Sequence, residues 1–276
     1  MRHDISQKIR EYAIKNPAIE SIFFVRSFND DEFTKIYTVV NDIIIGKLEE
    51  ELVDLFDGLI LVRRRKESES LDKKDFSYTT IDLYLKDNVK ISESIIADDM
   101  AEDFIGTLPS DIEFLYNRPG SKFLNPNQNF TYGRVKEYEF SQNTKNFFAS
   151  AIEVSFYIRQ GNYLAASIKM EEVRSELISM LRVHVREKYH GSRDIGVDGR
   201  ELTHSLAKEY KDELLETFSD AQPLNIYDSL FKACVLFRKV GMDSADKLGF
   251  SYARETDVKS MRLLRENYKK LESFLN

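Results

Sequence analysis

The pattern of apolar and polar positions changes character near residue 135 of the 276-residue chain. Before that point, short runs of β-branched and aromatic residues alternate with amphipathic helical patterns. Beyond it, apolar residues recur at spacings of three and four almost throughout. The sequence therefore predicts an α+β protein of two domains. Residues 1–135 are expected to form a mixed sheet with flanking helices, and residues 136–276 a bundle of antiparallel helices.

The first half predicts helices and strands in alternation. The expected elements are a helix over residues 4–15, strands over 22–25 and 43–45, a helix over 48–56, strands over 59–62 and 77–85, and a helix over 92–104. Residues 107–133 hold three of the five prolines. They are interpreted as an ordered connection across the domain junction, because they are too apolar for a free linker.

Helical periodicity is clearest at the start of the second half. Four residues share one face of the first expected helix, namely Phe147, Ala151, Val154 and Ile158. Five more share a face of the next helix with one offset, namely Leu164, Ile168, Val173, Leu177 and Leu181. Gly161 and Asn162 separate these two helices. Further helices are expected over residues 202–218, 226–240 and 256–274.

Charge and composition exclude several classes of protein. Residues 1–135 carry 18 Lys and Arg against 25 Asp and Glu, whereas residues 136–276 carry 22 of each. The acidic first half argues against a broad nucleic-acid surface, which is usually basic, and permits a cationic ligand. Cys234 is the only cysteine, so an internal disulfide or a thiolate zinc site is excluded, and its apolar neighbours predict that it is buried.

Nothing in the sequence predicts a membrane segment. No apolar run approaches the roughly 18 to 20 residues that cross a bilayer, and the first residues lead into an amphipathic segment rather than a signal peptide. A cytoplasmic protein is expected. The oligomeric state is not set by any feature of the sequence.

Two isolated carboxylates are the most informative candidates for chemistry. Asp42 precedes an isoleucine run, and Asp82 lies inside a run that predicts a strand. A carboxylate among apolar strand residues is costly to desolvate, so it needs a cation, a hydrogen-bond donor or an exposed strand end. Two such carboxylates on nearby strands would suit a divalent metal ion.

Three segments of the first half, read with the helices that follow, resemble a known family. They are residues 23–28 (Phe-Phe-Val-Arg-Ser-Phe), 40–43 (Val-Asn-Asp-Ile) and 81–83 (Ile-Asp-Leu). Together with the helical stretch around residues 174–180 they resemble the aminoglycoside 6-adenylyltransferases, also called streptomycin adenylyltransferases. These are divergent members of the polymerase-β-like nucleotidyltransferase superfamily. The resemblance implies a nucleotidyltransferase-like sheet followed by a helical bundle, with ATP as co-substrate and Mg²⁺ as the metal.

The resemblance also implies roles for individual residues. In that family a Gly-Ser turn holds nucleotide phosphate, an Asp-x-Asp pair opens the next strand and binds magnesium, and a third Asp follows on a later strand. Ser27 falls at the serine of the turn, with Arg26 in place of the glycine and Phe28 in place of an arginine. The resemblance thus implies that Ser27 and Arg26 lie at the nucleotide.

The metal-binding positions are only partly retained. Asp42 matches the second member of the metal pair, Val40 occupies the first, and Asp82 matches the third carboxylate, as metal ligand or base. Losing one ligand of three degrades the metal site. Asp30, Asp31 and Glu32 are alternative sources of the missing ligand. Arg200 lies near a Gly-Lys position of the family and is a candidate phosphate contact.

Two hypotheses about function follow. The first is an adenylyltransferase that moves AMP from ATP to a hydroxyl of a small, cationic, aminoglycoside-like molecule, as in antibiotic resistance. The second is a catalytically inactive relative that binds a ligand or regulates another process, because the Gly-Ser turn and the first metal-binding Asp are replaced. The retained Asp42 and Asp82 favour the first hypothesis, and Arg26 and Val40 favour the second.

Overall fold

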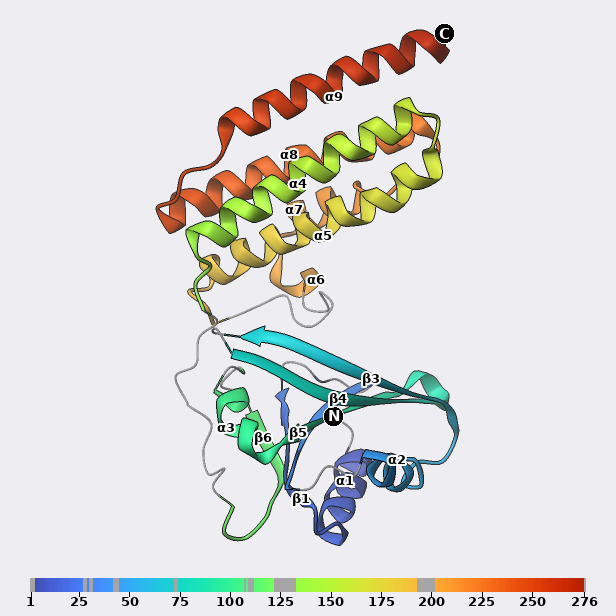
Figure 1. The fold of residues 1–276 in the computed structure, drawn as a ribbon, viewed down its shortest axis with the longest axis vertical. Helices are drawn as coiled ribbons and strands as arrows, with labels where there is room; N and C mark the ends of the chain where they lie inside the picture. The colour runs from blue at the N-terminus through green and yellow to red at the C-terminus, as the bar shows by residue number, and fades with distance from the viewer. Residues whose placement is uncertain are drawn as a thin grey trace. The chain divides into compact units, whose positions relative to one another are not determined.

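The computed structural model describes residues 3–26, 29, 32–41, 45–71, 74–106, 108, 112–121, 133–192 and 202–275. The chain divides into two compact units, Met1–Thr131 and Tyr132–Asn276 (Figure 1). The first unit is built on a mixed sheet with flanking helices, and the second is helical. This confirms the expected fold class. The boundary expected after residue 135 lies four residues beyond Thr131.

A six-stranded mixed sheet forms the centre of the first unit. Its strands are β1 (Ile19–Val25), β2 (Phe33–Val40), β3 (Leu59–Leu71), β4 (Lys74–Leu85), β5 (Lys90–Ala97) and β6 (Ile112–Asn117). Their order across the sheet is β3-β4-β5-β2-β1-β6. The β2 and β5 strands run parallel, and the other neighbours are antiparallel. A short 3-10 turn, η2 (Lys86–Asn88), joins β4 to β5.

Helices cover both faces of this sheet, because side chains alternate between the faces along each strand. The α1–α2 face packs against α1 (His3–Lys15) and α2 (Ile45–Val53). Its buried strand residues are Ile19, Ile22, Phe24, Ile36, Val40, Ile81, Leu83, Ile91, Ile95 and Leu115. The α3 face packs against α3 (Asp98–Ile105). Its strand residues are Phe23, Val25, Tyr37, Val39, Phe76, Tyr78 and Ile96.

Several elements of the first unit differ from the sequence-based expectations. The β2 strand was not expected, and the predicted strand at 43–45 is wrong at Ile45, which begins α2; residues 43 and 44 lie outside the described residues. The helix predicted over 92–104 is wrong in its first part, which is β5. The expected connection after residue 107 contains β6. In β2 and β5 the buried faces include polar residues, which hid the strand pattern.

The second unit packs four long helices around one core. They are α4 (Glu137–Arg159), α5 (Tyr163–Lys188), α8 (Pro223–Leu248) and α9 (Arg254–Leu275), with the shorter α6 (Leu202–Ser205) and α7 (Lys208–Leu215). Gly161 has a positive φ of 74°, and the Asn162 side chain caps α5 by accepting a hydrogen bond from the Ala165 amide. Phe147 of α4 stacks on Phe237 of α8 with ring centroids 3.8 Å apart.

The predicted helix faces are only partly buried. All four residues of the α4 face lie in the core, as do the last three of the α5 face. Leu164 and Ile168, however, are 71% and 63% exposed. The α5 face is continued toward its start by Ala166 and Met170 instead. The offset in the sequence pattern thus marks the point where the predicted face was wrong.

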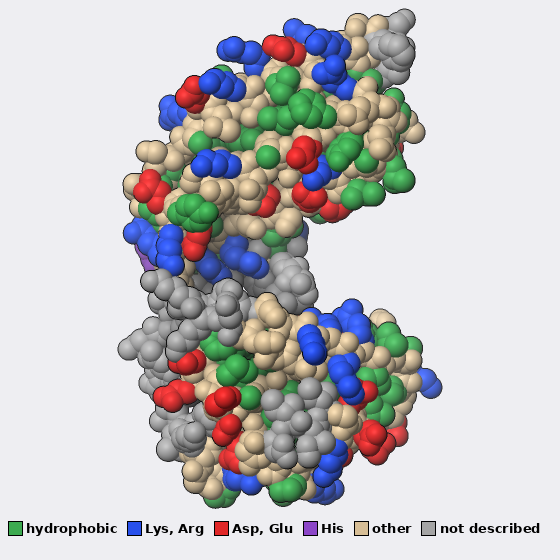
Figure 2. Space-filling view, viewed as in Figure 1, with side chains coloured by type: hydrophobic (Ala, Val, Ile, Leu, Met, Phe, Trp, Pro, Cys, Tyr) green, Lys and Arg blue, Asp and Glu red, His purple; other side chains and the backbone are tan. Residues whose placement is uncertain are grey.

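Three further expectations can be compared with the described residues. Cys234 is buried, and burial raises the pKa of its thiol to about 12. No helix in the described ranges combines the length and apolar character that a bilayer span requires. Where side chains are described, the face seen in Figure 2 mixes basic and acidic groups on each unit, with no broad basic area in view.

Candidate active site

Of the two acids predicted as metal ligands, Asp42 and Asp82, only Asp82 lies within the described residues. It occupies β4 between Ile81 and Leu83, which face α1 and α2, so its side chain points to the α3 face. The side chain is fully buried. Its isolation in an apolar strand is therefore real, and the compensating partners must come from neighbouring strands.

Four side chains surround the Asp82 carboxylate. Arg63 donates from Nε at 3.1 Å and Nη2 at 2.7 Å to Oδ2, and Arg65 donates from Nε at 2.9 Å to the same oxygen. Ser92 donates from Oγ to Oδ1 at 2.6 Å, and the Lys90 ammonium lies 3.7 Å from Oδ1. Both carboxylate oxygens are thus engaged by charge-assisted hydrogen bonds or by a cation.

Strand register explains why these groups meet. Arg63 lies directly opposite Asp82 in the antiparallel β3–β4 pair, and Arg65 follows two residues later on the same face. On the other side, Ser92 of β5 lies directly opposite Asp82, and Lys90 is two residues away. The long β3–β4 hairpin therefore delivers two arginines to one buried acid.

The partners decide the charge of Asp82. Burial alone would raise its pKa, but hydrogen bonds from Arg65, Ser92 and Arg63, together with the charge of Lys90, outweigh that effect and lower the pKa to about 2. Asp82 is therefore ionised across the neutral range. Its charge is balanced by neighbouring cations.

The described residues around Asp82 do not fit a magnesium ion. Mg²⁺ requires an octahedron of oxygen ligands, and each positive side chain nearby opposes it. Among the described residues no group of three potential metal ligands occurs. Asp82 instead has three cationic side chains within 4 Å, namely those of Arg63, Arg65 and Lys90.

The sheet register also identifies which β2 residue is level with Asp82. Asp82 pairs with Ser92, and Ser92 pairs with Lys35 of β2, close to the start of that strand. Lys35 is buried, and its ammonium lies 5.3 Å from the Tyr37 ring centroid. Near the start of β2, this chain therefore has a lysine on the row of Asp82.

Val40 does not share this face. It lies five positions further along β2, pairs with Ala97, and packs in the core beneath α1 and α2. Val40 and Asp82 therefore point to opposite faces of the sheet. In this geometry Val40 belongs to the apolar core. Its assignment to a metal pair with Asp42, which lies outside the described residues, stays a prediction.

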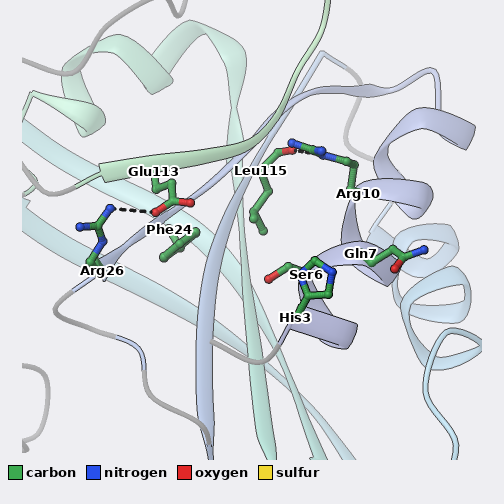
Figure 3. Close-up of a pocket in the computed structure, with 8 residues that line it drawn as sticks. All are labelled: His3, Ser6, Gln7, Arg10, Phe24, Arg26, Glu113 and Leu115. Atoms are coloured by element: carbon green, nitrogen blue, oxygen red, sulfur yellow. Dashed lines mark hydrogen bonds and ion pairs between the residues drawn. The ribbon is translucent and has the colours of Figure 1, made fainter.

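Arg26 follows the end of β1 and lines a cavity of about 610 Å³ between α1, β1 and β6 (Figure 3). It forms an ion pair with Glu113 at 3.1 Å, and both side chains are at least half exposed. Phe24, which lines the same cavity, belongs to the α1–α2 face. Arg26 is thus not brought together with Asp82, which lies three strands away on the α3 face.

The other predicted site residues lie outside the described residues. These are Ser27, Asp42 and Arg200, with Phe28, Asp30 and Asp31. Their roles at phosphate and metal stay predictions. Glu32 is described, and its carbonyl accepts a hydrogen bond from the Lys90 amide.

Two features of the site were missed from the sequence. Arg63 and Arg65 were not among the candidate residues, although basic residues at alternate positions of a strand before an isolated acid are a signal for such pairing. Glu93 was assigned to a helix, yet it is fully buried on the α1–α2 face and accepts a 2.5 Å hydrogen bond from Thr38. No pattern in the sequence marks that second acid.

Comparison with known proteins identifies a family for the chain and a solved structure of similar fold. The family model for streptomycin adenylyltransferase matches residues 2–266. No curated protein matches significantly. Among solved structures, an aminoglycoside 6-adenyltransferase from Bacillus subtilis is 18% identical, with a TM-score of 0.50 over 97% of this chain and 99% of that one. A nucleotidyltransferase-like protein from Exiguobacterium sibiricum is 13% identical, with a TM-score of 0.40 over 88% and 78%.

The family match covers nearly the whole chain, and the Bacillus subtilis structure shares its fold. The chain therefore belongs to the streptomycin adenylyltransferase family and has a nucleotidyltransferase fold.

Proposed function

We propose that this family member binds an anionic small-molecule ligand in its α/β unit and does not transfer AMP. The observation that carries the proposal is the ion cluster at Asp82. The acid that matches the family's third carboxylate is bonded to Arg63 and Arg65 and approached by Lys90. A ligand-binding or regulatory role fits a fold that is kept while its metal chemistry is lost.

The chemistry of nucleotidyl transfer supports this proposal. Metal ions held by carboxylates neutralise the charge that builds up on the reacting phosphates. In this protein the negative charge of Asp82 is balanced by cationic side chains, and Lys35 lies on the same row of the sheet. Binding Mg²⁺ there would require the carboxylate to exchange hydrogen bonds from two guanidinium groups for a metal ion close to their positive charges.

A second candidate function is favoured by the family match over residues 2–266. It is the transfer of AMP from ATP, with Mg²⁺, to a hydroxyl of an aminoglycoside-like molecule. The acidic balance of the first half is compatible with a cationic acceptor. This candidate requires Asp42, or another acid outside the described residues, to supply the metal ligands.

Pyrophosphate release separates the two candidates. The full chain is incubated with ATP, Mg²⁺ and a panel of aminoglycosides, beside an active family member as positive control. We expect no pyrophosphate above the level without acceptor. Acceptor-dependent release that is abolished by Asp82→Asn, in a variant whose circular dichroism is unchanged, would overturn the proposal and establish the transferase.

A further inference from the structure

We infer that Arg63, Arg65 and Lys90 form a preassembled site for the phosphate groups of a small molecule, held without a divalent metal ion, with Asp82 as its internal anchor. The inference deepens the proposed function and rests on it, since it names the chemistry of the ligand. The three cationic side chains around Asp82 oppose a Mg²⁺ ion but suit an anion.

The anchor fixes the two guanidinium groups and leaves part of each available. Arg63 donates hydrogen bonds from Nε and Nη2 to Asp82. Arg65 donates one from Nε to Asp82, and its Nη1 forms an ion pair with Glu67. These contacts do not involve Nη1 of Arg63 or Nη2 of Arg65. The two side chains are 51% and 38% exposed, so water or a ligand can reach them, whereas Asp82 is fully buried.

Cation–π contacts with aromatic rings help to fix the positions of Arg63 and Lys90. The guanidinium of Arg63 lies 5.8 Å from the Tyr84 ring centroid, and the Lys90 ammonium lies 5.5 Å from the same ring. Lys90 also lies 5.1 Å from the ring of Phe33. Because these contacts and the bonds to Asp82 are made before any ligand arrives, little side-chain entropy remains to be lost on binding.

The cluster has a positive surplus. Three cations, Arg63, Arg65 and Lys90, face two anions, Asp82 and Glu67, which leaves a net charge of +1. The pKa of Asp82 is lowered to about 2 by this arrangement, so the count holds at neutral pH. An anion is therefore the ligand that completes the cluster.

Phosphate is the anion that these donors fit best. A guanidinium group presents planar, paired N–H donors that match two phosphate oxygens, and a lysine adds a point charge. The donors come from three side chains on two strands, β3 and β5. Donors spread in this way suit several linked phosphate groups better than a single carboxylate. A divalent metal ion is unnecessary, because the protein supplies the positive charge that the metal would carry.

The test uses inorganic tripolyphosphate as probe, titrated into the full chain by calorimetry in EDTA. We expect saturable binding in EDTA, and no increase in affinity when Mg²⁺ replaces EDTA. Arg63→Ala and Arg65→Ala should each lower the affinity about tenfold, because each removes one charge-assisted contact. Arg64→Ala is the matched control, because Arg64 is 48% exposed and bonds Glu49 of α2, on the other face of the sheet.

Three results would overturn the inference. The first is no tripolyphosphate binding in EDTA, and the second is binding that appears only with Mg²⁺. The third is an equal loss of affinity in Arg64→Ala and Arg63→Ala, which would indicate nonspecific attraction by positive charge. Thermal unfolding of each variant checks that it is folded, and Arg63→Gln replaces Arg63→Ala if the latter is not. No pyrophosphate release together with no tripolyphosphate binding would overturn this inference alone, whereas acceptor-dependent release would overturn the proposed function.

Discussion

Asp82 and Glu93 are two fully buried acids on neighbouring strands, and their pKa values are shifted in opposite directions. Asp82 pairs with Ser92, and Glu93 pairs with Ile81, so the two acids are one position apart in register and point to opposite faces of the sheet. On the α3 face Asp82 has a pKa of about 2. On the α1–α2 face, burial raises the pKa of Glu93 to about 7.

The difference lies in the partners. Asp82 receives hydrogen bonds from two arginines and a serine, with Lys90 nearby. Glu93 accepts one hydrogen bond from Thr38. Tyr12 also opposes the rise in its pKa, while Glu51 adds to it. Burial by itself therefore does not set the charge of an acid in this sheet; the number and charge of the donors do.

The largest effect is expected where an acid is placed on the α1–α2 face without a donor. Val40→Asp should lower the free energy of unfolding by at least ~4 kcal/mol, because the new carboxylate enters an apolar core. Urea unfolding measures this effect. Val40→Ala is the control and should cost about 2 kcal/mol for lost packing alone. A folded Val40→Asp protein that gains stability from Mg²⁺ would instead place this residue at a metal site.

A smaller loss is expected from Asp82→Asn. Removing the charge leaves two arginines without their counterion, which should cost about 3 kcal/mol, the low end for a buried pair because both guanidinium groups are partly hydrated. The loss should be full above pH 3.8 and shrink as the pH falls toward 2, since the folded-state pKa is lowered. Equilibrium unfolding across this range gives the curve.

Glu113→Gln provides the control for Asp82→Asn. Its carboxylate is 50% exposed in the ion pair with Arg26, so the change should cost less than about 0.5 kcal/mol. Equal losses in the two variants would contradict the role of burial and donors at Asp82.

The effect of Glu93→Gln on stability should grow as the pH rises from 4.5 to about 7. Since the folded-state pKa is raised from 4.5 to about 7, the contribution of Glu93 to wild-type stability is fully present below pH 4.5 and is lost as the pH rises through 7. The variant has no such proton to lose, so at pH 8 it should be more stable than wild type by on the order of 3 kcal/mol. At pH 4.5 the two proteins should have similar stability. A pH-independent difference would show that Glu93 does not titrate in this window.

The smallest effects are expected from the hydroxyl donors. Ser92→Ala removes a bond to ionised Asp82 and should cost about 2 kcal/mol at pH 7, whereas Thr38→Val removes a bond to neutral Glu93 and should cost about 1 kcal/mol at pH 5. Chemical denaturation at both pH values measures the loss of unfolding free energy in each variant. The reverse order at acidic pH would mean that Glu93 is already charged there.

The helical unit was easier to predict than the sheet for a physical reason. A helix buries one face with a period that is visible in the sequence, so Phe147, Ala151 and Val154 were placed in the core correctly. In the sheet, β5 is buried on both faces, and Ser92 and Glu93 are internal because Asp82 and Thr38 bond to them. With polar residues at these buried positions, the segment was predicted as part of a helix over residues 92–104.

The site was predictable only as far as its isolated acid. Asp82 was found because a charge between Ile81 and Leu83 breaks the strand pattern. Its partners were not found, since they depend on which residue of β3 and which of β5 lies opposite. The same register puts Lys35 on the Asp82 row and turns Val40 toward α1 and α2.

The sequence by itself determined the two-part α+β architecture, the positions of the long helices and the presence of an unusual acid in a strand. These follow from local periodicity and from the cost of burying charge. Only the tertiary structure decided that the acid is balanced by two arginines instead of a metal-ligand set, and that Glu93 is a second buried acid. Both depend on strand order and register, which arise from contacts between residues distant in sequence.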